Sequence, residues 1–180
     1  WLHATAAGRT PIQGRNPPRL TDTTRHSKVE SKLADAIRDD RIFPHYQPEV
    51  DLLTGKIIGF EALARWHDEE LGMISPGEFI PLAEQSGAID PLTERLFAQV
   101  VKDSHTIRDH LPNAKIALNS SPQLLAGKRL LNILSHLASE LDNGLDGFVL
   151  EITETDFALS AQELAIQLQS IMGFGDRIAL

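Results

Sequence analysis

The sequence predicts an α/β fold built from parallel β–α–β units. Short apolar stretches with strand character alternate along the chain with longer amphipathic stretches of helix character, which is typical of a parallel sheet covered by helices. A doubly wound sheet and a TIM-type barrel both fit this alternation. A complete barrel needs about 250 residues, so residues 43–180 supply about half of one.

Residues 1–26 are predicted to be a linker, because proline and glycine recur there without apolar periodicity. A connector helix is predicted within residues 27–42, where Ser27 and Glu30 have the spacing of a capping box. Three apolar residues recur on one face of this helix: Val29, Leu33 and Ile37. The helix is interpreted either as a solvated connector or as a signalling helix that couples an upstream domain.

A β-hairpin is predicted next, with strands at 43–53 and 56–66 joined at Thr54-Gly55. A helix should then begin at Pro76, behind the N-cap Ser75, and stop near Gly87. The remaining elements are three strands and three helical regions. The strands are predicted at 115–119, 147–153 and from 177 onward, and the helices at 91–110, within 122–141 and at 160–172.

Composition excludes several classes of function. The chain has no cysteine, which rules out disulfides and thiolate chemistry and fits a cytoplasmic location. Residues 1–41 carry a net charge of +3 and the remainder −11, so the acidic body argues against binding of DNA or RNA polymers. A small anionic nucleotide stays compatible, because a bound divalent metal reverses the local field. No apolar run approaches the roughly 20 residues that span a membrane; membrane tethering of a longer parent protein is left open.

The most informative stretch is Gly59 to Trp66, which places an acid and a cation four residues apart in an apolar run. Side chains alternate between the faces of a strand, so Glu61, Leu63 and Arg65 point the same way. A carboxylate that can hold a metal therefore lies beside a guanidinium that can hold a phosphate.

Two later strands also carry oxygen ligands near their carboxyl ends, where α/β folds place functional side chains. Asn119 ends one strand, and Glu151 and Glu154 belong to another, with an odd spacing that points them to opposite faces. Carboxylate and amide oxygens suit Mg²⁺ or Mn²⁺. The chemistry of the two acids also allows a glycosidase pair, but that interpretation does not explain Arg65 or Gln47.

Five sequence blocks in order resemble the EAL-domain family of cyclic di-GMP phosphodiesterases. The blocks are Tyr46-Gln47-Pro48, Glu61-Ala62-Leu63 with Arg65-Trp66, Pro76 to Gln85, Leu118-Asn119, and Glu151-Ile152-Thr153-Glu154. The resemblance implies a modified (β/α)8 TIM-type barrel, of which this chain holds the N-terminal half. It also implies hydrolysis of one phosphodiester of cyclic di-GMP, giving linear pGpG.

The resemblance further assigns a role to each matching residue. It implies that Glu61, Asn119 and Glu151 bind Mg²⁺ or Mn²⁺, with Glu61 also the catalytic residue, and that Glu154 supports them. The implied substrate contacts are Gln47, Leu63 and Arg65, with Arg65 on a phosphate. Other interpretations stay open: Gln47 pairing with neighbouring backbone, Leu63 filling the barrel, and Arg65 pairing with an acid such as Asp68.

In the family, an Asp-Asp-Phe-Gly motif that completes the metal site follows the strand that begins here at Arg177. Because the chain stops before that motif and starts at Trp1 rather than Met, we expect residues 43–180 to be a truncated EAL domain, inactive as an isolated fragment. The alternative is a non-catalytic EAL domain that binds cyclic di-GMP or a protein partner. An upstream sensory or GGDEF-type domain and a homodimer that covers the exposed sheet edge are the further partners considered.

Overall fold

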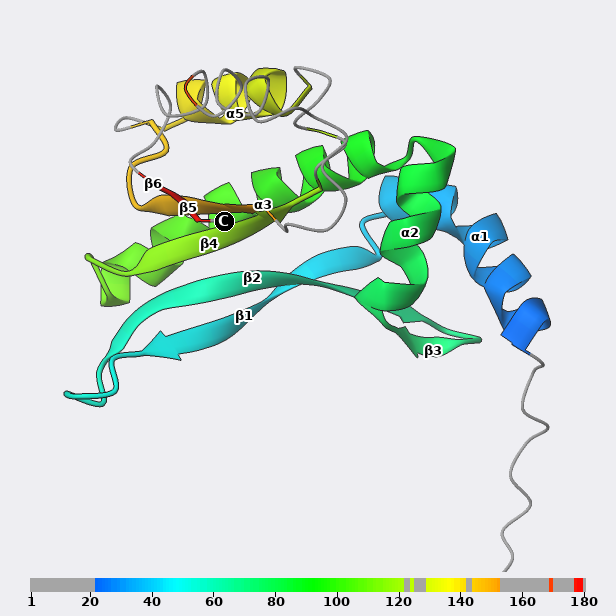
Figure 1. Cartoon of the computed structure of the whole chain (residues 1–180), viewed down its shortest axis with the longest axis horizontal. Coiled ribbons are helices and arrows are strands. Elements are labelled where there is room, and N and C mark those ends of the chain that lie inside the picture. Colours follow the sequence, from blue (N-terminus) through cyan, green and yellow to red (C-terminus); the bar gives the residue numbers. More distant parts are fainter. Residues whose placement is uncertain are drawn as a thin grey trace, which may run out of the picture.

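A computed structural model of the chain describes residues 22–121, 124, 129–141, 144–152, 169 and 177–179. The elements follow the predicted strand–helix order (Figure 1). They are α1 (Asp22–Arg38), β1 (Ile42–Val50), β2 (Ile57–Asp68), β3 (Gly72–Ile74), α2 (Pro76–Ser86), α3 (Ile89–His110), β4 (Lys115–Ser120), α5 (Arg129–Ser139), β5 (Phe148–Ile152) and β6 (Arg177–Ala179). Most of the predicted linker and of the helix predicted at 160–172 lies outside the described residues.

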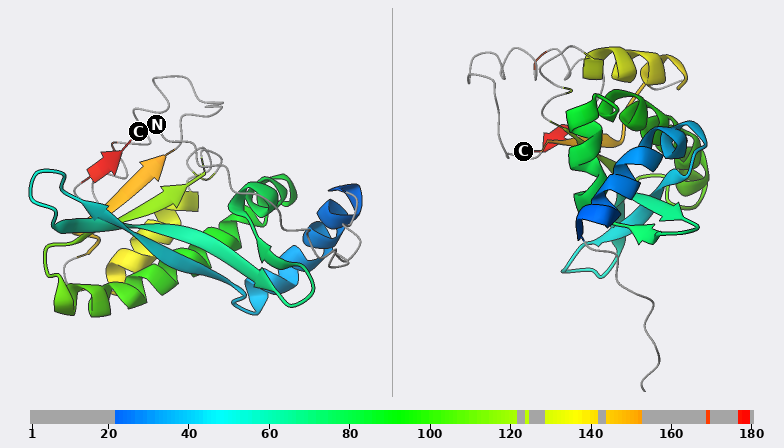
Figure 2. Two further views of the ribbon diagram at one scale, coloured as in Figure 1. Left: turned by 90° about the horizontal axis from the view of Figure 1, so that it is seen from below. Right: turned by 90° about the vertical axis from the view of Figure 1, so that its right-hand side faces the viewer.

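The sheet has the strand order β1-β2-β4-β5-β6, with β3 paired to the end of β2. Strands β2, β4, β5 and β6 run parallel, whereas β1 and β3 are each antiparallel to β2. Figure 2 shows β4, β5 and β6 side by side and pointing the same way. The prediction of parallel β–α–β units is confirmed. The β1–β2 hairpin forms one edge of the sheet.

The predicted hairpin is present, but its loop is longer than the Thr54-Gly55 turn. The Asp51 carboxylate accepts hydrogen bonds from the backbone N–H groups of Leu53 and Thr54, at 3.0 and 2.7 Å. Gly55 then takes a positive φ of 67°, which glycine adopts without strain. Strand β3 was missed because three residues carry too little pattern to predict a strand.

Gly59 allows three strands to approach one another closely. A Cβ atom at this position would lie 2.9 Å from the Glu49 carboxylate on β1 and 2.9 Å from the Lys115 carbonyl oxygen on β4. Real Cβ atoms do not tolerate such distances, so a larger residue would push β2 away from the β4 backbone and displace the Glu49 carboxylate. The glycine therefore keeps the strand that carries Glu61 in register with both of them.

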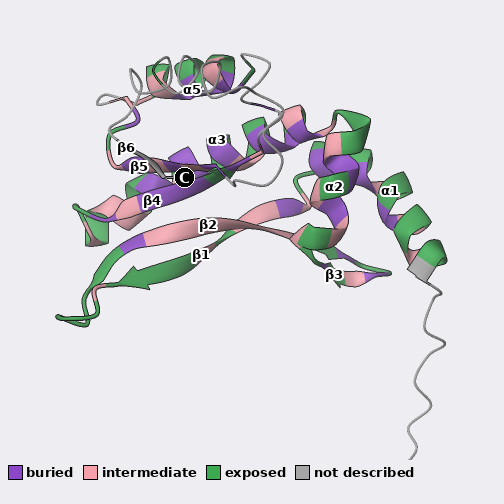
Figure 3. Cartoon of the chain, viewed as in Figure 1, coloured by how far each residue is buried: buried purple, intermediate pink, exposed green. Residues whose placement is uncertain are grey.

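Helix α3 supplies most of the hydrophobic cover of the sheet, packing against β1 and β4 (Figure 1). Its buried face includes Leu92, Phe97 and Val100, each at most 3% exposed. Figure 3 shows the buried residues concentrated between this helix and the strands, with exposed residues at the far end of the β1–β2 hairpin. No described helix combines the length and the apolar character needed to cross a membrane.

Helix α2 has the predicted ends. The Ser75 N–H donates to the Glu78 carboxylate over 3.3 Å, Pro76 occupies the first turn, and Gly87 ends the helix with a φ of 73°. These signals are local in sequence. They predict both helix ends, and a distant residue, Arg25, adds a contact to Glu78.

Helix α1 begins earlier than predicted, and the capping box at Ser27 and Glu30 is wrong. Both residues lie inside a helix that starts at Asp22. Contacts with residues outside α1 stabilise the additional turn. The Arg25 guanidinium donates hydrogen bonds to the Glu78 carboxylate over 2.7 Å and to the Leu71 carbonyl oxygen over 3.3 Å. The predicted apolar face is correct: Val29, Leu33 and Ile37 are all buried.

Asp68 anchors α1 to the end of β2. Its side chain is 2% exposed, and it lies 2.8 Å from the Lys32 ammonium and 3.4 Å from the Arg41 guanidinium. The same carboxylate accepts hydrogen bonds from the N–H groups of Glu70 and Leu71, both at 3.0 Å. Burial alone would raise the pKa of Asp68, but Lys32 and the two N–H groups outweigh it and lower the pKa below its usual value.

Replacing Asp68 by alanine is expected to lower the free energy of unfolding by about 2 kcal/mol, because it leaves buried donors without an acceptor. Urea denaturation at pH 7 measures this loss, and the exposed neighbour Glu69, changed to alanine, should shift it by less than about 0.5 kcal/mol. Since the folded pKa of Asp68 is lowered, its contribution is complete above about pH 4 and disappears as the pH falls through the folded value. A loss that is equal at pH 7 and pH 2 would contradict the role of the charge.

Candidate active site

The two halves of the Glu61–Arg65 motif lie on one face of β2, as the alternation predicts. In the β1–β2 register Glu61 lies opposite Gln47, and in the β2–β4 register it lies opposite Ala117. Asn119 is two residues beyond Ala117 and therefore projects from the same face of the sheet. Three of the predicted site residues, Gln47, Glu61 and Asn119, thus meet on adjacent strands.

A hydrogen bond joins the first two predicted metal ligands. The Asn119 side-chain amide donates from Nδ2 to Glu61 Oε1 over 2.8 Å. Glu151 lies directly opposite Asn119 in the β4–β5 register and continues the row of oxygen ligands onto the next strand. Glu154, the predicted supporting residue, lies outside the described residues.

The carboxylates of this row influence one another. Burial raises the pKa of the Glu151 carboxyl group, and the negative charges of Glu61 and Glu49 raise it further. Glu49 was not predicted as part of the site. Its position two residues after Gln47 on the same strand face was the available signal, and Gly59 brings its carboxylate against β2.

The donor chemistry fits a divalent cation. Glu61 and Glu151 offer carboxylate oxygens, and Asn119 keeps its Oδ1 oxygen available while Nδ2 is engaged with Glu61. A cation between these groups would also relieve the repulsion that raises the pKa of Glu151. Within the described part of the chain, no three Asp, Glu or His side chains converge in metal-binding geometry, so the set consists of two carboxylates and one amide.

The predicted substrate contacts have few competing partners. Arg65 is half-buried and donates to the carbonyl oxygen of its neighbour Ala64 over 2.8 Å. The alternative pairing with Asp68 is not observed, because that carboxylate is occupied by Lys32 and Arg41. In the described structure, Arg65 has no ion pair, and its remaining N–H groups are available for an anion.

The other two predicted contacts differ in their surroundings. Gln47 is exposed on β1, and among the described residues its side chain makes no hydrogen bond to neighbouring backbone. Leu63 is half-buried and lines a cavity beside the site.

A family model described as "EAL domain" matches residues 30–180 of the chain. The chain is 38% identical over 128 residues to "Probable cyclic di-GMP phosphodiesterase PdeB" of Escherichia coli, covering 71% of this chain and 25% of that protein. It is 35% identical over 144 residues to "Probable cyclic di-GMP phosphodiesterase PdeG" of the same organism, covering 79% of this chain and 28% of that protein. The chain thus spans about a quarter of the length of these relatives.

Among solved structures, the chain resembles the phosphodiesterase PaMucR in complex with c-di-GMP, with a TM-score of 0.77 and 28% identity. The superposition covers 84% of this chain and 62% of the other. The likeness decides between the two α/β architectures. The predicted N-terminal half of a modified (β/α)8 barrel is confirmed.

Changing Glu151 to glutamine is expected to raise the melting temperature of the metal-free protein at pH 8, because it removes a partly buried charge that lies near the charges of Glu61 and Glu49. The folded pKa of Glu151 is raised, so the repulsion is present above that pKa and fades as the pH falls toward 4. Mn²⁺ should stabilise the wild type and have a weaker effect on the variant. Thermal unfolding measures both effects, and exposed Glu94, changed to glutamine, is the control. A variant that melts below the wild type at pH 8 without metal would contradict the electrostatic argument.

Proposed function

Because the chain belongs to the EAL-domain family, we propose that it forms part of the active site of a cyclic di-GMP phosphodiesterase. The reaction is hydrolysis of one phosphodiester bond to give linear pGpG. The observation that carries the proposal is the hydrogen bond between Glu61 and Asn119 beside Glu151, which gathers oxygen ligands from three strands. The names of the two Escherichia coli relatives support it.

Glu61, Asn119 and Glu151 are proposed to hold Mg²⁺ or Mn²⁺, with Glu154 as a supporting acid. A bound divalent ion supplies a water of lowered pKa and neutralises charge on the phosphoryl group. Asn119 orients the Glu61 carboxylate through its Nδ2 donor and leaves its own carbonyl oxygen for the cation. Glu61 is the proposed catalytic residue because it combines the metal contact with a position on the same strand face as Arg65.

Arg65 is proposed to bind a phosphate of the substrate. Its guanidinium uses one N–H group for the Ala64 carbonyl oxygen, and its other N–H groups can donate to a phosphate. Arg65 also lies two residues beyond Leu63, on the site face of β2. Gln47, exposed and opposite Glu61, is proposed to contact the substrate from β1. Leu63 supplies an apolar surface between Glu61 and Arg65.

One observation favours a second candidate, a non-catalytic EAL domain that binds cyclic di-GMP or a protein partner. Among the described residues, no group of three or more Asp, Glu or His side chains has a geometry that could hold a metal ion. Such a site can recognise a nucleotide without activating water. The cytoplasmic location, the upstream sensory or GGDEF-type domain and the homodimer stay predictions.

Purified residues 1–180 with Mg²⁺ or Mn²⁺ are expected to show no turnover of cyclic di-GMP above a Glu61→Ala control. In a longer protein that contains this segment, Glu61→Ala should lower kcat more than about 100-fold, because it removes a metal ligand. Product analysis by chromatography measures pGpG. Wild-type turnover by residues 1–180 would contradict the expected inactivity. Unchanged kcat in the longer variant would contradict the metal-ligand role.

Changing Arg65 to lysine in the longer protein is expected to weaken cyclic di-GMP binding about tenfold, because lysine cannot form a bidentate phosphate contact. Calorimetric titration in the presence of Ca²⁺ measures the affinity. Arg38, exposed and far along α1, provides the matched control as Arg38→Lys. Equal weakening in both variants would show a general charge effect rather than a phosphate contact.

A further inference from the structure

Within the described sheet, the end of β4 is paired with a neighbouring strand along one edge only. Its pairing with β2 stops at Leu118, whereas its pairing with β5 continues to Ser120. Asn119 lies between these two positions, in the part of the strand that has no partner on β2. The β4–β5 pairing therefore fixes Asn119 relative to Glu151, but strand pairing does not fix its distance from Glu61 on β2.

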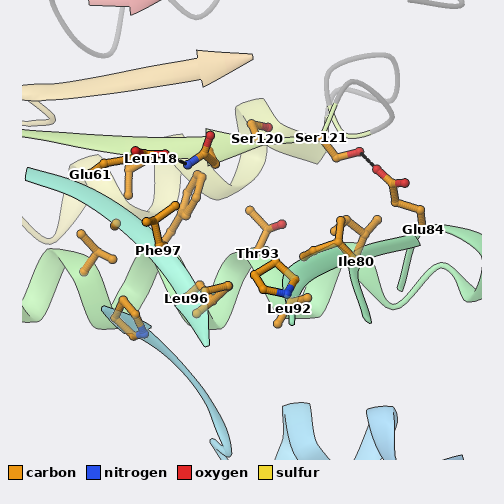
Figure 4. Close-up of a pocket in the computed structure, with 18 of the residues that line it drawn as sticks. Glu61, Ile80, Glu84, Leu92, Thr93, Leu96, Phe97, Leu118, Ser120 and Ser121 are labelled. Carbon is orange, nitrogen blue, oxygen red and sulfur yellow. Dashed lines mark hydrogen bonds between the residues drawn. The ribbon is translucent and has the colours of Figure 1, made fainter. Parts of the chain in front are cut away.

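A cavity of about 440 Å³ that adjoins the candidate site opens beside this strand end (Figure 4). Its lining includes the small residues Ala62 and Ala64 of β2 and the larger residues Leu96 and Phe97 of α3. Because side chains do not fill this space, packing alone does not fix the separation between β2 and the end of β4. Another contact has to hold the two strands at a defined distance.

Helix α2 bridges the two strands. On the β2 side, the Phe79 ring packs edge-on against the Trp66 ring, with the ring centroids 5.7 Å apart, and both side chains are fully buried. On the β4 side, the Ser121 hydroxyl donates a hydrogen bond to the Glu84 carboxylate over 2.5 Å (Figure 4). The helix thus links the later part of β2 to the residue that directly follows β4.

The position of Glu84 is unfavourable for the stability of its own helix. It belongs to the last turn of α2, where the partial negative charge of the helix C-terminus repels a carboxylate. This turn carries no basic residue that would offset the repulsion. The hydrogen bond from Ser121, by contrast, is strengthened by the carboxylate charge. The contact with the end of β4 therefore explains an acid at this position, whereas helix stability does not.

We propose that Glu84 is a positioning residue for the proposed metal site. By holding Ser121, it keeps the end of β4 at the distance from β2 at which Asn119 Nδ2 reaches Glu61 Oε1. Figure 4 shows Glu84 and Glu61 at opposite ends of the cavity, so Glu84 acts through the backbone of β4 and is not itself a ligand of the cation. The inference rests on the proposed function, because it takes Glu61 and Asn119 to be metal ligands.

The metal-free protein tests the geometry directly. In the NMR spectrum of residues 1–180, the Asn119 side-chain amide signals, identified by their loss in Asn119→Ala, report the hydrogen bond to Glu61. Glu84→Ala should move these signals toward their positions in Glu61→Ala, which lacks the acceptor. Glu84→Gln keeps an acceptor oxygen for Ser121 and should leave them near the wild-type positions. Wild-type positions in a folded Glu84→Ala variant would overturn the proposal.

The affinity for Mn²⁺ tests the consequence for the metal site. Calorimetric titration of residues 1–180 at pH 7 should show about three- to tenfold weaker Mn²⁺ binding by Glu84→Ala and by Ser121→Ala, because contacts that orient a ligand affect metal affinity. The double variant should bind no more weakly than either single variant, since all three lose the same hydrogen bond. Glu84→Gln should stay within about twofold of the wild type. Glu94→Ala, which removes an exposed charge from α3, is the control.

The two measurements separate this inference from the proposed function. If wild-type residues 1–180 bind no Mn²⁺, the proposed metal site fails, and the Asn119 signals alone decide whether Glu84 positions the end of β4. Equal Mn²⁺ affinity of the wild type and a folded Glu84→Ala variant would overturn the positioning role and leave the proposed function intact. Equal weakening by Glu84→Ala and Glu84→Gln would show an effect of charge rather than of the bond to Ser121, and would also overturn it. Circular dichroism confirms that each variant is folded.

Discussion

The alternation of side chains along β2 is the constraint on which the rest of the structure depends. The strand is paired along both edges, to β1 on one side and to β4 and β3 on the other. Its register can therefore not slip by one residue without moving Glu61 and Arg65 to the helix side and Trp66 to the site side. Gly59 supports this arrangement, because a side chain there would collide with both neighbouring strands.

The site face has unfavourable electrostatics in the absence of a cation. Glu49, Glu61 and Glu151 belong to β1, β2 and β5, and burial together with the charges of Glu61 and Glu49 raises the pKa of Glu151. A domain selected only for stability would not keep such a row, since apolar or neutral residues would pack there without repulsion. Repulsion that a divalent ion relieves is a property of a binding site rather than of a core.

A structural feature could be predicted from the sequence wherever the residues that determine it are neighbours in the chain. The ends of α2 follow from Ser75, Pro76 and Gly87, and the shared face of Glu61 and Arg65 follows from strand alternation alone. The start of α1 was not predictable in this way, because the Arg25 contacts that hold its first turns come from residues more than 40 positions away.

The same limit applies to the candidate site. The roles of Glu61, Asn119 and Glu151 were expected from family resemblance, but their contact depends on the β2–β4–β5 register, which no local signal specifies. Asp68 appeared to be a partner for Arg65 because the two are close in sequence. Its actual partners, Lys32 and Arg41, are set by the packing of α1. The cavity arises from alanines facing α3 residues, and only tertiary packing brings these together.

The end of β4 connects the two faces of the sheet. Asn119 holds Glu61 on one face, and the next residue, Ser120, is buried on the other. The bond between Ser121 and Glu84 then ties this strand end to α2. Because these three residues are consecutive, any displacement of the strand end must also move the amide that orients Glu61.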